Sequence, residues 1–408
     1  MFQISLLVFA LLVCLPTVSS AQRAFVGLDG NNSLVIRPPP DGQVLIDGAD
    51  FRTLVAKVEA LAQQVEAQAQ QLETQAQQLQ AQRCTTVVAD TSTITGLSGP
   101  GKWYGGVLAG NGGIYGTPWS SASVLIIDPA TNTADTTTIT GLSAECCKWV
   151  GGVLAGNGKI YGIPHSWASV LIIDPATNTA DTTTITGLNG SGKWYGGVLA
   201  GNGKIFGIPF WSASVLIIDP ATNTTDTTTI TGLTADCCKW IGGVLAGNGK
   251  IYGIPSYSAS VLIIDPDTST ADTTTIAGLS GAFKWAGGVL AGNGKIYGIP
   301  WNSASVLIID PATNTADTTT IAGLSGDGKW YDGVLARNGK IYGIPRNSDS
   351  VVIIDPVTNT TDTATTGLSG DYKWHGGVLA GNDKIYGFPH HSDSVLIIQS
   401  GCVLTSGL

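Results

Sequence analysis

Polar and ionisable side chains gather near the C-terminal end of this chain. They are Arg346, Asn347, Asp349, His375, His390, His391 and Asp393. Histidine and aspartate can hold a metal ion or transfer protons. Their spacing matches no metal-ligand motif, and His390 and His391 would point to opposite sides of an extended chain. We therefore expect these side chains to hydrogen-bond a ligand, with a metal or acid–base site as the alternative.

Aromatic residues recur in a set of short segments whose sequence varies. The segments read PWSSAS, PHSWAS, PFWSAS, PSYSAS, PWNSAS, PRNSDS and PHHSDS. Their aromatic side chains are Trp119, Trp167, Phe210, Trp211, Tyr257 and Trp301. Rings among serine and asparagine suit a binding surface, because they stack on sugars or anchor a protein partner. We expect a ligand to contact them together with Arg346, His390 and His391; the alternative is that the rings fold back onto the core.

A Lys-Trp pair recurs ahead of each of these segments. The lysines are Lys102, Lys148, Lys193, Lys239, Lys284, Lys329 and Lys373. A tryptophan in every copy predicts packing between repeated units. The lysines could ring a channel mouth and attract an anion. We favour instead solvated side chains whose stems lie over the tryptophan rings.

Other common chemical motifs are missing from the sequence. The repeated segment DPATNTAD has Asp and Asn at short intervals but lacks the Gly and the terminal Glu of a calcium loop. The sequence contains no phosphate-binding loop, nucleophile elbow or zinc signature. We therefore assign no cofactor, no metal ligand and no catalytic residue, and we favour a protein that is not an enzyme.

The candidate residues are carried by repeats of about 45 residues. The tryptophans of the Lys-Trp pairs are Trp103, Trp149, Trp194, Trp240, Trp285, Trp330 and Trp374, spaced by 46, 45, 46, 45, 45 and 44 residues. Each copy contains four β-like stretches, which read WYGGVLAG, KIYGIP, SVLIID and DTTTITGL in the commonest form. Asn-Gly and Pro-Ala-Thr-Asn turns separate them. Seven such units predict an all-β fold, a seven-bladed β-propeller.

The ends of the array predict how the ring closes. The last copy lacks the fourth stretch, and DTSTITGLSG stands instead at Asp90, ahead of the first copy. This segment should pair with the last blade and remove a sheet edge. A disulfide between Cys84 and Cys402 would lock that seam. The variable segments should all lie on one face of the ring, and the repeated AGNGK and DPATNTAD turns on the other.

The string NGKIYGIP followed by SVLIIDPATNT resembles a kelch-type repeat, and the resemblance covers roughly residues 102–398. Kelch repeats have an Asn-Gly-Lys-Ile-Tyr strand and then an apolar strand that ends in Asp-Pro-x-Thr-Asn. This chain departs from the family after the tyrosine, where Ile-Pro replaces paired glycines, and in the position of its tryptophan. The resemblance implies a propeller fold. The copper site of the galactose-oxidase branch has no residue-by-residue match here.

Two pairs of adjacent cysteines occupy the same loop of the second and fourth copies, in SAECCKW and TADCCKW. A bond from one loop to the other would span a whole blade, which exceeds the reach of a disulfide, about 7 Å between Cα atoms. We therefore predict vicinal disulfides between Cys146 and Cys147 and between Cys237 and Cys238. Free or intermolecularly bonded thiols are the alternative.

The N-terminal part differs from the repeats. Residues 1–21 are typical of a signal peptide, so we expect a secreted protein with glycans at Asn31, Asn189, Asn223 and Asn359. Residues 22–50 should form an extended or β head, and residues 84–408 the propeller. Residues 51–83 carry a heptad seam of Leu54, Val58, Leu61, Val65, Leu72 and Leu79, which predicts a coiled coil. A solvated single helix or a disordered Gln-rich linker is the alternative.

Composition and pattern together favour a recognition function. The formal charge is −9 without a basic tract, so nucleic acid is not an expected partner, and no membrane span is expected after signal removal. We expect a secreted homo-oligomer that binds a glycan or an extracellular protein through the variable face. The alternatives are a secreted hydrolase, lyase or oxidase acting at the last two blades, or a structural matrix or wall protein.

Overall fold

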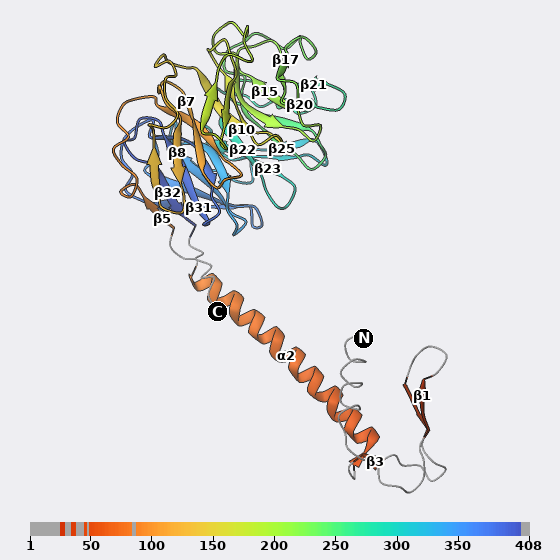
Figure 1. Cartoon of the computed structure of the whole chain (residues 1–408). Coiled ribbons are helices and arrows are strands. Elements are labelled where there is room, and N and C mark those ends of the chain that lie inside the picture. Colours follow the sequence, from red (N-terminus) through yellow and green to blue (C-terminus); the bar gives the residue numbers. More distant parts are fainter. Residues whose placement is uncertain (1–24, 29–33, 38–44, 47–48, 84–86, 401–408) are drawn as a thin grey trace. The chain divides into compact units, whose positions relative to one another are not determined.

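The computed structural model describes residues 25–28, 34–37, 45–46, 49–83 and 87–400 (Figure 1). The predicted signal peptide, the Asn31 sequon and the Cys84–Cys402 bond lie outside these residues. The chain divides into two units, Met1–Gln82 and Arg83–Leu408. Among the residues described, none of the helices has the length and apolar character needed to cross a membrane.

The first unit contains two short antiparallel strand pairs and one long helix. Strand β1 (Phe25–Leu28) pairs with β2 (Leu34–Arg37), and β3 (Leu45–Ile46) pairs with β4 (Ala49–Asp50). Helix α2 (Phe51–Arg83) has 33 residues, a length of about 50 Å at 1.5 Å per residue. The helix agrees with the heptad pattern. Its association with further copies stays a prediction.

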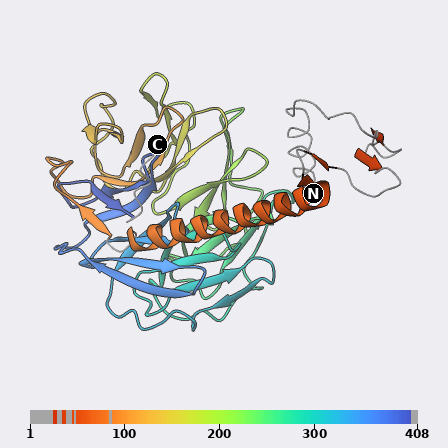
Figure 2. The ribbon, with the colours of Figure 1, turned by 90° about the horizontal axis from the view of Figure 1, so that it is seen from below.

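In residues 87–400, seven antiparallel four-stranded sheets form blades around a common centre (Figure 2). The first strands are β6 (Trp103–Leu108), β10 (Trp149–Leu154), β14 (Trp194–Leu199), β18 (Trp240–Leu245), β22 (Trp285–Leu290), β26 (Trp330–Leu335) and β30 (Trp374–Leu379). The second strands are β7 (Ile114–Pro118), β11 (Ile160–Pro164), β15 (Ile205–Pro209), β19 (Ile251–Pro255), β23 (Ile296–Pro300), β27 (Ile341–Pro345) and β31 (Lys384–Pro389). The predicted seven-bladed propeller is confirmed.

The outer strands complete each blade. The third strands are β8 (Leu125–Asp128), β12 (Leu171–Asp174), β16 (Leu216–Asp219), β20 (Leu262–Asp265), β24 (Leu307–Asp310), β28 (Ser350–Asp355) and β32 (Leu396–Gln399). The fourth strands are β9 (Thr133–Asp135), β13 (Thr179–Asp181), β17 (Thr224–Asp226), β21 (Thr270–Asp272), β25 (Thr315–Asp317), β29 (Thr360–Thr365) and, in the last blade, β5 (Val88–Asp90).

The ring closes as the sequence predicts. Strand β5 pairs with β32, and Asp90, Ala89 and Val88 lie opposite Ile397, Ile398 and Gln399. The extent of the fourth strand was predicted wrongly, because in most blades it ends at the aspartate that begins DTTTITGL. The Oδ1 atom of that aspartate in the first blade, Asp135, accepts a hydrogen bond from the Thr137 N–H at 2.6 Å. Such a side-chain turn bends the chain out of the sheet.

The core lies between neighbouring blades. Trp194, at the start of the third blade, packs with Tyr161 and Ile163 of the second blade. The predicted packing of tryptophans between blades is therefore confirmed. The opposite side of each junction is closed by polar groups: the hydroxyl of Tyr161 donates to Asn223 Oδ1 at 2.9 Å, and the Asn157 amide donates to the Pro220 carbonyl at 3.1 Å. These contacts explain why the AGNGK and DPATNTAD turns repeat almost unchanged.

Candidate functional site

Two rings of side chains lie at the centre of the propeller, one from the variable segments and one from the first strands. The residues that follow the prolines of the second strands are Trp119, His165, Phe210, Ser256, Trp301, Arg346 and His390. The residues that follow the tryptophans of the first strands are Tyr104, Val150, Tyr195, Ile241, Ala286, Tyr331 and His375. The first six of this second ring form one buried cluster. We call these two sets the outer ring and the inner ring.

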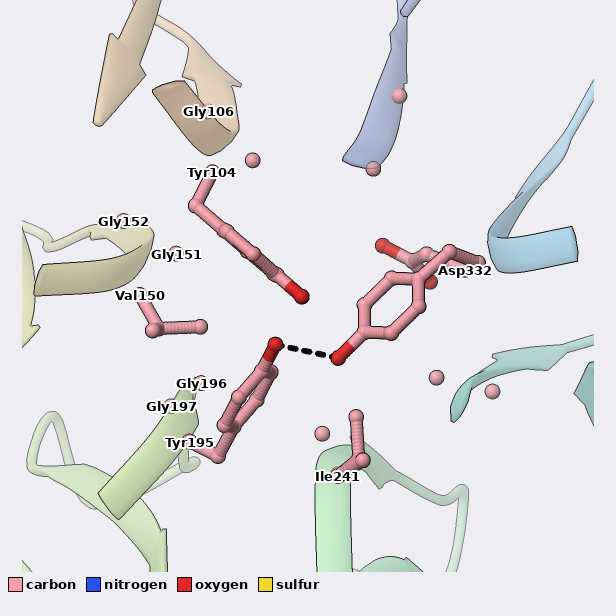
Figure 3. A pocket seen from close by; sticks show the side chains of 18 of the residues that line it. Tyr104, Gly106, Val150, Gly151, Gly152, Tyr195, Gly196, Gly197, Ile241 and Asp332 are labelled. Carbon is pink, nitrogen blue, oxygen red and sulfur yellow. Dashed lines mark hydrogen bonds between the residues drawn. The ribbon is translucent and has the colours of Figure 1, made fainter. Parts of the chain in front are cut away.

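A bulge in each first strand builds the inner ring. In the first blade Trp103 lies opposite Pro118, but the next paired residues are Gly106 and Gly116, so the register shifts between them. The shift turns Tyr104 away from the regular ladder and toward the centre. Figure 3 shows Tyr104 and its counterparts from other blades converging there.

Three of the six predicted aromatic residues cover the inner ring. Trp119, Phe210 and Trp301 pack against the central cluster, and the Trp119 ring lies 5.1 Å from that of Tyr104. Trp167 packs beside Trp149, with 5.8 Å between the ring centroids. These four rings are half-buried and follow the alternative in which they complete the core.

The other two predicted aromatic residues are exposed. Trp211 is 46 % exposed and Tyr257 is 43 % exposed, on adjacent blades. The Trp211 ring continues a stack with Phe210 at 6.4 Å, and the Tyr257 ring meets the edge of Phe283 at 4.4 Å. Phe283 was not predicted as a site residue, because it belongs to the loop before a Lys-Trp pair and not to a variable segment. Its only sequence signal is that the other copies have no aromatic residue at that point of the loop, except for Tyr372.

The polar sector of the last two blades is assembled as a stack of rings. The His375 ring lies 4.7 Å from Tyr331 and 4.1 Å from His390, and His390 lies 4.7 Å from His391. Arg346 Nε donates to His375 Nε2 at 3.0 Å. The expectation that His390 and His391 point to opposite sides is wrong. Strand β31 ends at Pro389, so both residues lie in a bend and their rings stack.

Burial keeps these histidines neutral. Burial, with the charges of neighbouring histidines and Arg346, holds the pKa of His375 well below its ordinary value and lowers the pKa of His390 to about 3. Because His375 Nε2 accepts from Arg346, its proton must lie on Nδ1. The Nδ1 atoms of His375 and His390 are buried and have no hydrogen-bond partner among the described residues. The same residues contain no group of three or more His, Cys, Asp or Glu side chains placed to hold a metal ion.

A cavity of about 300 Å³ lies beneath the inner ring, lined by tyrosines and by the glycine pairs of the first strands (Figure 3). The Tyr331 hydroxyl donates to that of Tyr195. In the sixth blade, Asp332 stands in place of the first glycine of the glycine pair, and it has a φ of 68°. Burial raises the pKa of Asp332 to about 6. The sequence signal for this residue was present, since WYDG is the single departure from the WxGG pattern.

The expectation that the seven lysines are solvated is wrong, whereas six of them lie over the tryptophan rings as expected. All seven are buried. Lys148 Nζ donates to the carbonyls of Trp119, Ser121 and Glu145 at 3.0–3.1 Å, while lying 5.7 Å from the Trp149 ring. Burial lowers the pKa of Lys148 to about 8. The group therefore stays an ammonium at pH 7, with three N–H donors for three carbonyls.

The adjacent cysteines are bonded within each pair, Cys146 to Cys147 and Cys237 to Cys238. Each bond lies in a loop beside a variable segment. The Cys238 carbonyl accepts from the Tyr257 N–H at 3.0 Å, so the fourth-blade pair helps to position an exposed ring. The sequons at Asn189, Asn223 and Asn359 are not buried, and their glycosylation stays a prediction.

The comparisons with known proteins show the fold. No family model and no curated protein matches the chain. A streptogramin B lyase structure is 10 % identical, covers 77 % of this chain and 97 % of its own, and has a TM-score of 0.58. A catalytically inactive variant of virginiamycin B lyase from Staphylococcus aureus with quinupristin is 10 % identical over 77 % and 99 %, with a TM-score of 0.62.

A third similar structure is the extracellular domain of a putative hybrid two-component system from B. thetaiotaomicron. It is 12 % identical and covers 79 % of this chain and 44 % of its own, with a TM-score of 0.58. At these identities the likeness supports the propeller and says nothing of the site. The kelch-type resemblance therefore reduces to a shared propeller architecture.

Proposed function

We propose that this protein is secreted and non-enzymatic, and that its variable face recognises a glycan or another extracellular protein. The observation that carries the proposal is the exposure of Trp211 and Tyr257 on neighbouring blades. The corresponding residues elsewhere are serine, asparagine or histidine. Large exposed rings on an otherwise repetitive scaffold are typical of a contact surface.

Two further features support an extracellular binding role. Disulfides form and persist mainly in oxidising compartments, and the chain has two of them within the described residues. Several propellers with a similar fold are extracellular domains. We also propose that α2 joins several copies into a coiled coil. Several heads bound to one repetitive surface would raise the overall avidity without new contacts.

A glycan array and a pull-down with the mature protein test this function. Replacing Trp211 and Tyr257 together by alanine should weaken binding by more than about tenfold, because each buried ring contributes on the order of 1–3 kcal/mol. Val357→Ala is the control, since that exposed side chain belongs to a turn of the opposite face. Unchanged binding by the double variant would exclude Trp211 and Tyr257 as the contact residues.

An enzymatic function is the second candidate, favoured by the neutral, unpartnered ring nitrogen of His390. A neutral imidazole in a desolvated site can act as a general base. Turnover of candidate substrates that is lost in His390→Ala, with folding retained, would establish a hydrolase, lyase or oxidase. Absence of turnover and of metal in the purified protein would leave recognition alone.

A further inference from the structure

We propose that Arg346 binds a carboxylate, and that the ligand of the variable face is an acidic sugar whose carboxylate binds between Arg346 and Asn347. The sugar part of this inference rests on the proposed recognition function. The carboxylate part rests on the geometry of the last two blades alone.

Arg346 is a buried cation without a counter-ion. The residue is 7 % exposed, and among the described residues no carboxylate lies within 4.0 Å of its guanidinium. The aspartates of the nearby loops act on lysines instead: Asp349 and Asp371 on Lys373, and Asp327 on Lys329. Buried charges in proteins are normally paired. Among the described residues, Arg346 therefore has no direct ion-pair partner.

The contacts of Arg346 fix the direction of its guanidinium. Nε is used by the bond to His375 Nε2. The guanidinium carbon lies 3.7 Å from the Tyr372 ring centroid and 5.1 Å from that of Trp301. The plane is thus held on two aromatic rings, and Nη1 and Nη2 donate no hydrogen bond to a described residue. Two parallel N–H groups on a fixed plane match the two oxygens of a carboxylate.

A further donor lies beside this guanidinium. Asn347 Oδ1 accepts from the Tyr372 N–H at 2.9 Å, which leaves its NH₂ group as a donor. This group and the guanidinium lie close together, because a Cβ placed at Gly328 would lie 2.4 Å from Asn347 Nδ2 and 3.0 Å from Arg346 Nη1. The guanidinium and the Asn347 NH₂ group are hydrogen-bond donors, and they offer no oxygen atom to a metal cation. An anion is therefore the complementary ligand.

Aromatic rings next to these donors favour a sugar as the carrier of the anion. Tyr372 is 42 % exposed, and its ring stacks at 5.3 Å on the exposed His391. A hexuronate would place its carboxylate at the donors and its CH groups against the exposed parts of these aromatic side chains. Because the whole chain has a formal charge of −9, it does not attract anions in general. The local positive charge of Arg346 would therefore select an anionic ligand at this position.

The test uses the full mature chain with ¹⁵N-labelled histidine, titrated with sodium glucuronate and, separately, with glucose. Glucuronate should shift the Nε2 resonance of His375, because that atom accepts from Arg346, and glucose should not. Arg346→Gln should weaken the response at least about tenfold, since a hydrogen bond to a charged group contributes roughly 1.5–3 kcal/mol. Arg337→Gln is the control, because it removes the same charge from a turn on the opposite face of the same blade.

Arg346→Lys is the second variant, in case the glutamine variant does not fold. It keeps the charge but loses the fork of donors, and should also weaken binding. Equal response to glucuronate and glucose, no response, or an undiminished response in a folded Arg346 variant would each overturn the carboxylate site. The Trp211 and Tyr257 double variant decides the recognition function separately, because those rings lie on the third and fourth blades.

Discussion

The buried lysines join each blade to the variable segment before it. Lys148 of the second blade bonds the carbonyls of Trp119 and Ser121 in the first. Lys102 does the same across the closure, with bonds to the carbonyls of His390 at 3.2 Å and Ser392 at 3.0 Å. The lysines thus position the backbone of the loops whose side chains form the outer ring. This role explains why a charged residue can be present in all seven copies without lying on the surface.

Replacing Lys148 by methionine should therefore destabilise the propeller. The carbonyls of Trp119, Ser121 and Glu145 would lose the ammonium donor, at a cost of about 3 kcal/mol in the free energy of unfolding. Denaturant unfolding at pH 7 measures the change. Lys159→Met is the matched control, because that lysine is exposed and its 3.6 Å ion pair with Asp174 contributes less than about 1 kcal/mol. Equal losses in the two variants would contradict the role given to Lys148.

At the scale of elements, the closure depends on one short strand. Strand β5 is three residues long and supplies the fourth position of the last blade. Backbone bonds from Leu97 to Asp393 and from Val395 to Ile94 extend the same seam. Without them β32 would become an open edge, which exposes unpaired backbone groups and promotes aggregation.

Truncation tests this seam. A chain that begins at residue 83 should unfold cooperatively, because it keeps the whole second unit. A chain that begins at residue 92 lacks β5, and should unfold at lower denaturant concentration and aggregate in sedimentation. Both truncated chains lack helix α2, so a difference between them reports on β5 and not on the helix. Equal stability would show that the ring closes without β5.

Repeat comparison predicted the strands and the closure, because these depend on hydrophobic alternation and on one missing segment. It did not predict the inner ring. Tyr104 and its counterparts differ from copy to copy, but only the bulge between Trp103 and Gly106 turns them to the centre, and a bulge leaves no pattern in alternation. The burial of the lysines was missed for a related reason: their acceptors are backbone carbonyls, which every residue has.

At the scale of the whole molecule, the turns on one face of the propeller have a nearly constant sequence, and the loops on the other face have a variable one. Asparagine and tyrosine side chains join neighbouring blades on one face, for example Asn157 and Tyr161, so those turns cannot change independently. On the other face the lysines hold only the backbone of the loops. The side chains of these loops can therefore differ between blades, so Arg346, Trp211 and Tyr257 each occur in a single blade.

Helix α2 predicts that the intact molecule is an oligomer. Leu61, Val65 and Leu72 of the heptad seam are 60 %, 63 % and 67 % exposed in a single chain. Most helical stability in proteins comes from the packing of an apolar face, and burying this seam against other copies would supply that packing. The mature chain should therefore sediment as more than a monomer, and a chain that begins at residue 83 as a monomer.

Charge on the seam should separate the copies. Leu61→Glu with Leu72→Glu places like charges in the buried stripe and should give a monomer with an intact propeller. Ala60→Glu with Gln71→Glu adds the same two charges outside the seam and should leave the oligomer in place. Both chains are compared by sedimentation velocity at equal concentration. A wild-type monomer, or dissociation by both double variants alike, would remove the coiled coil and with it the avidity expected from several joined propellers.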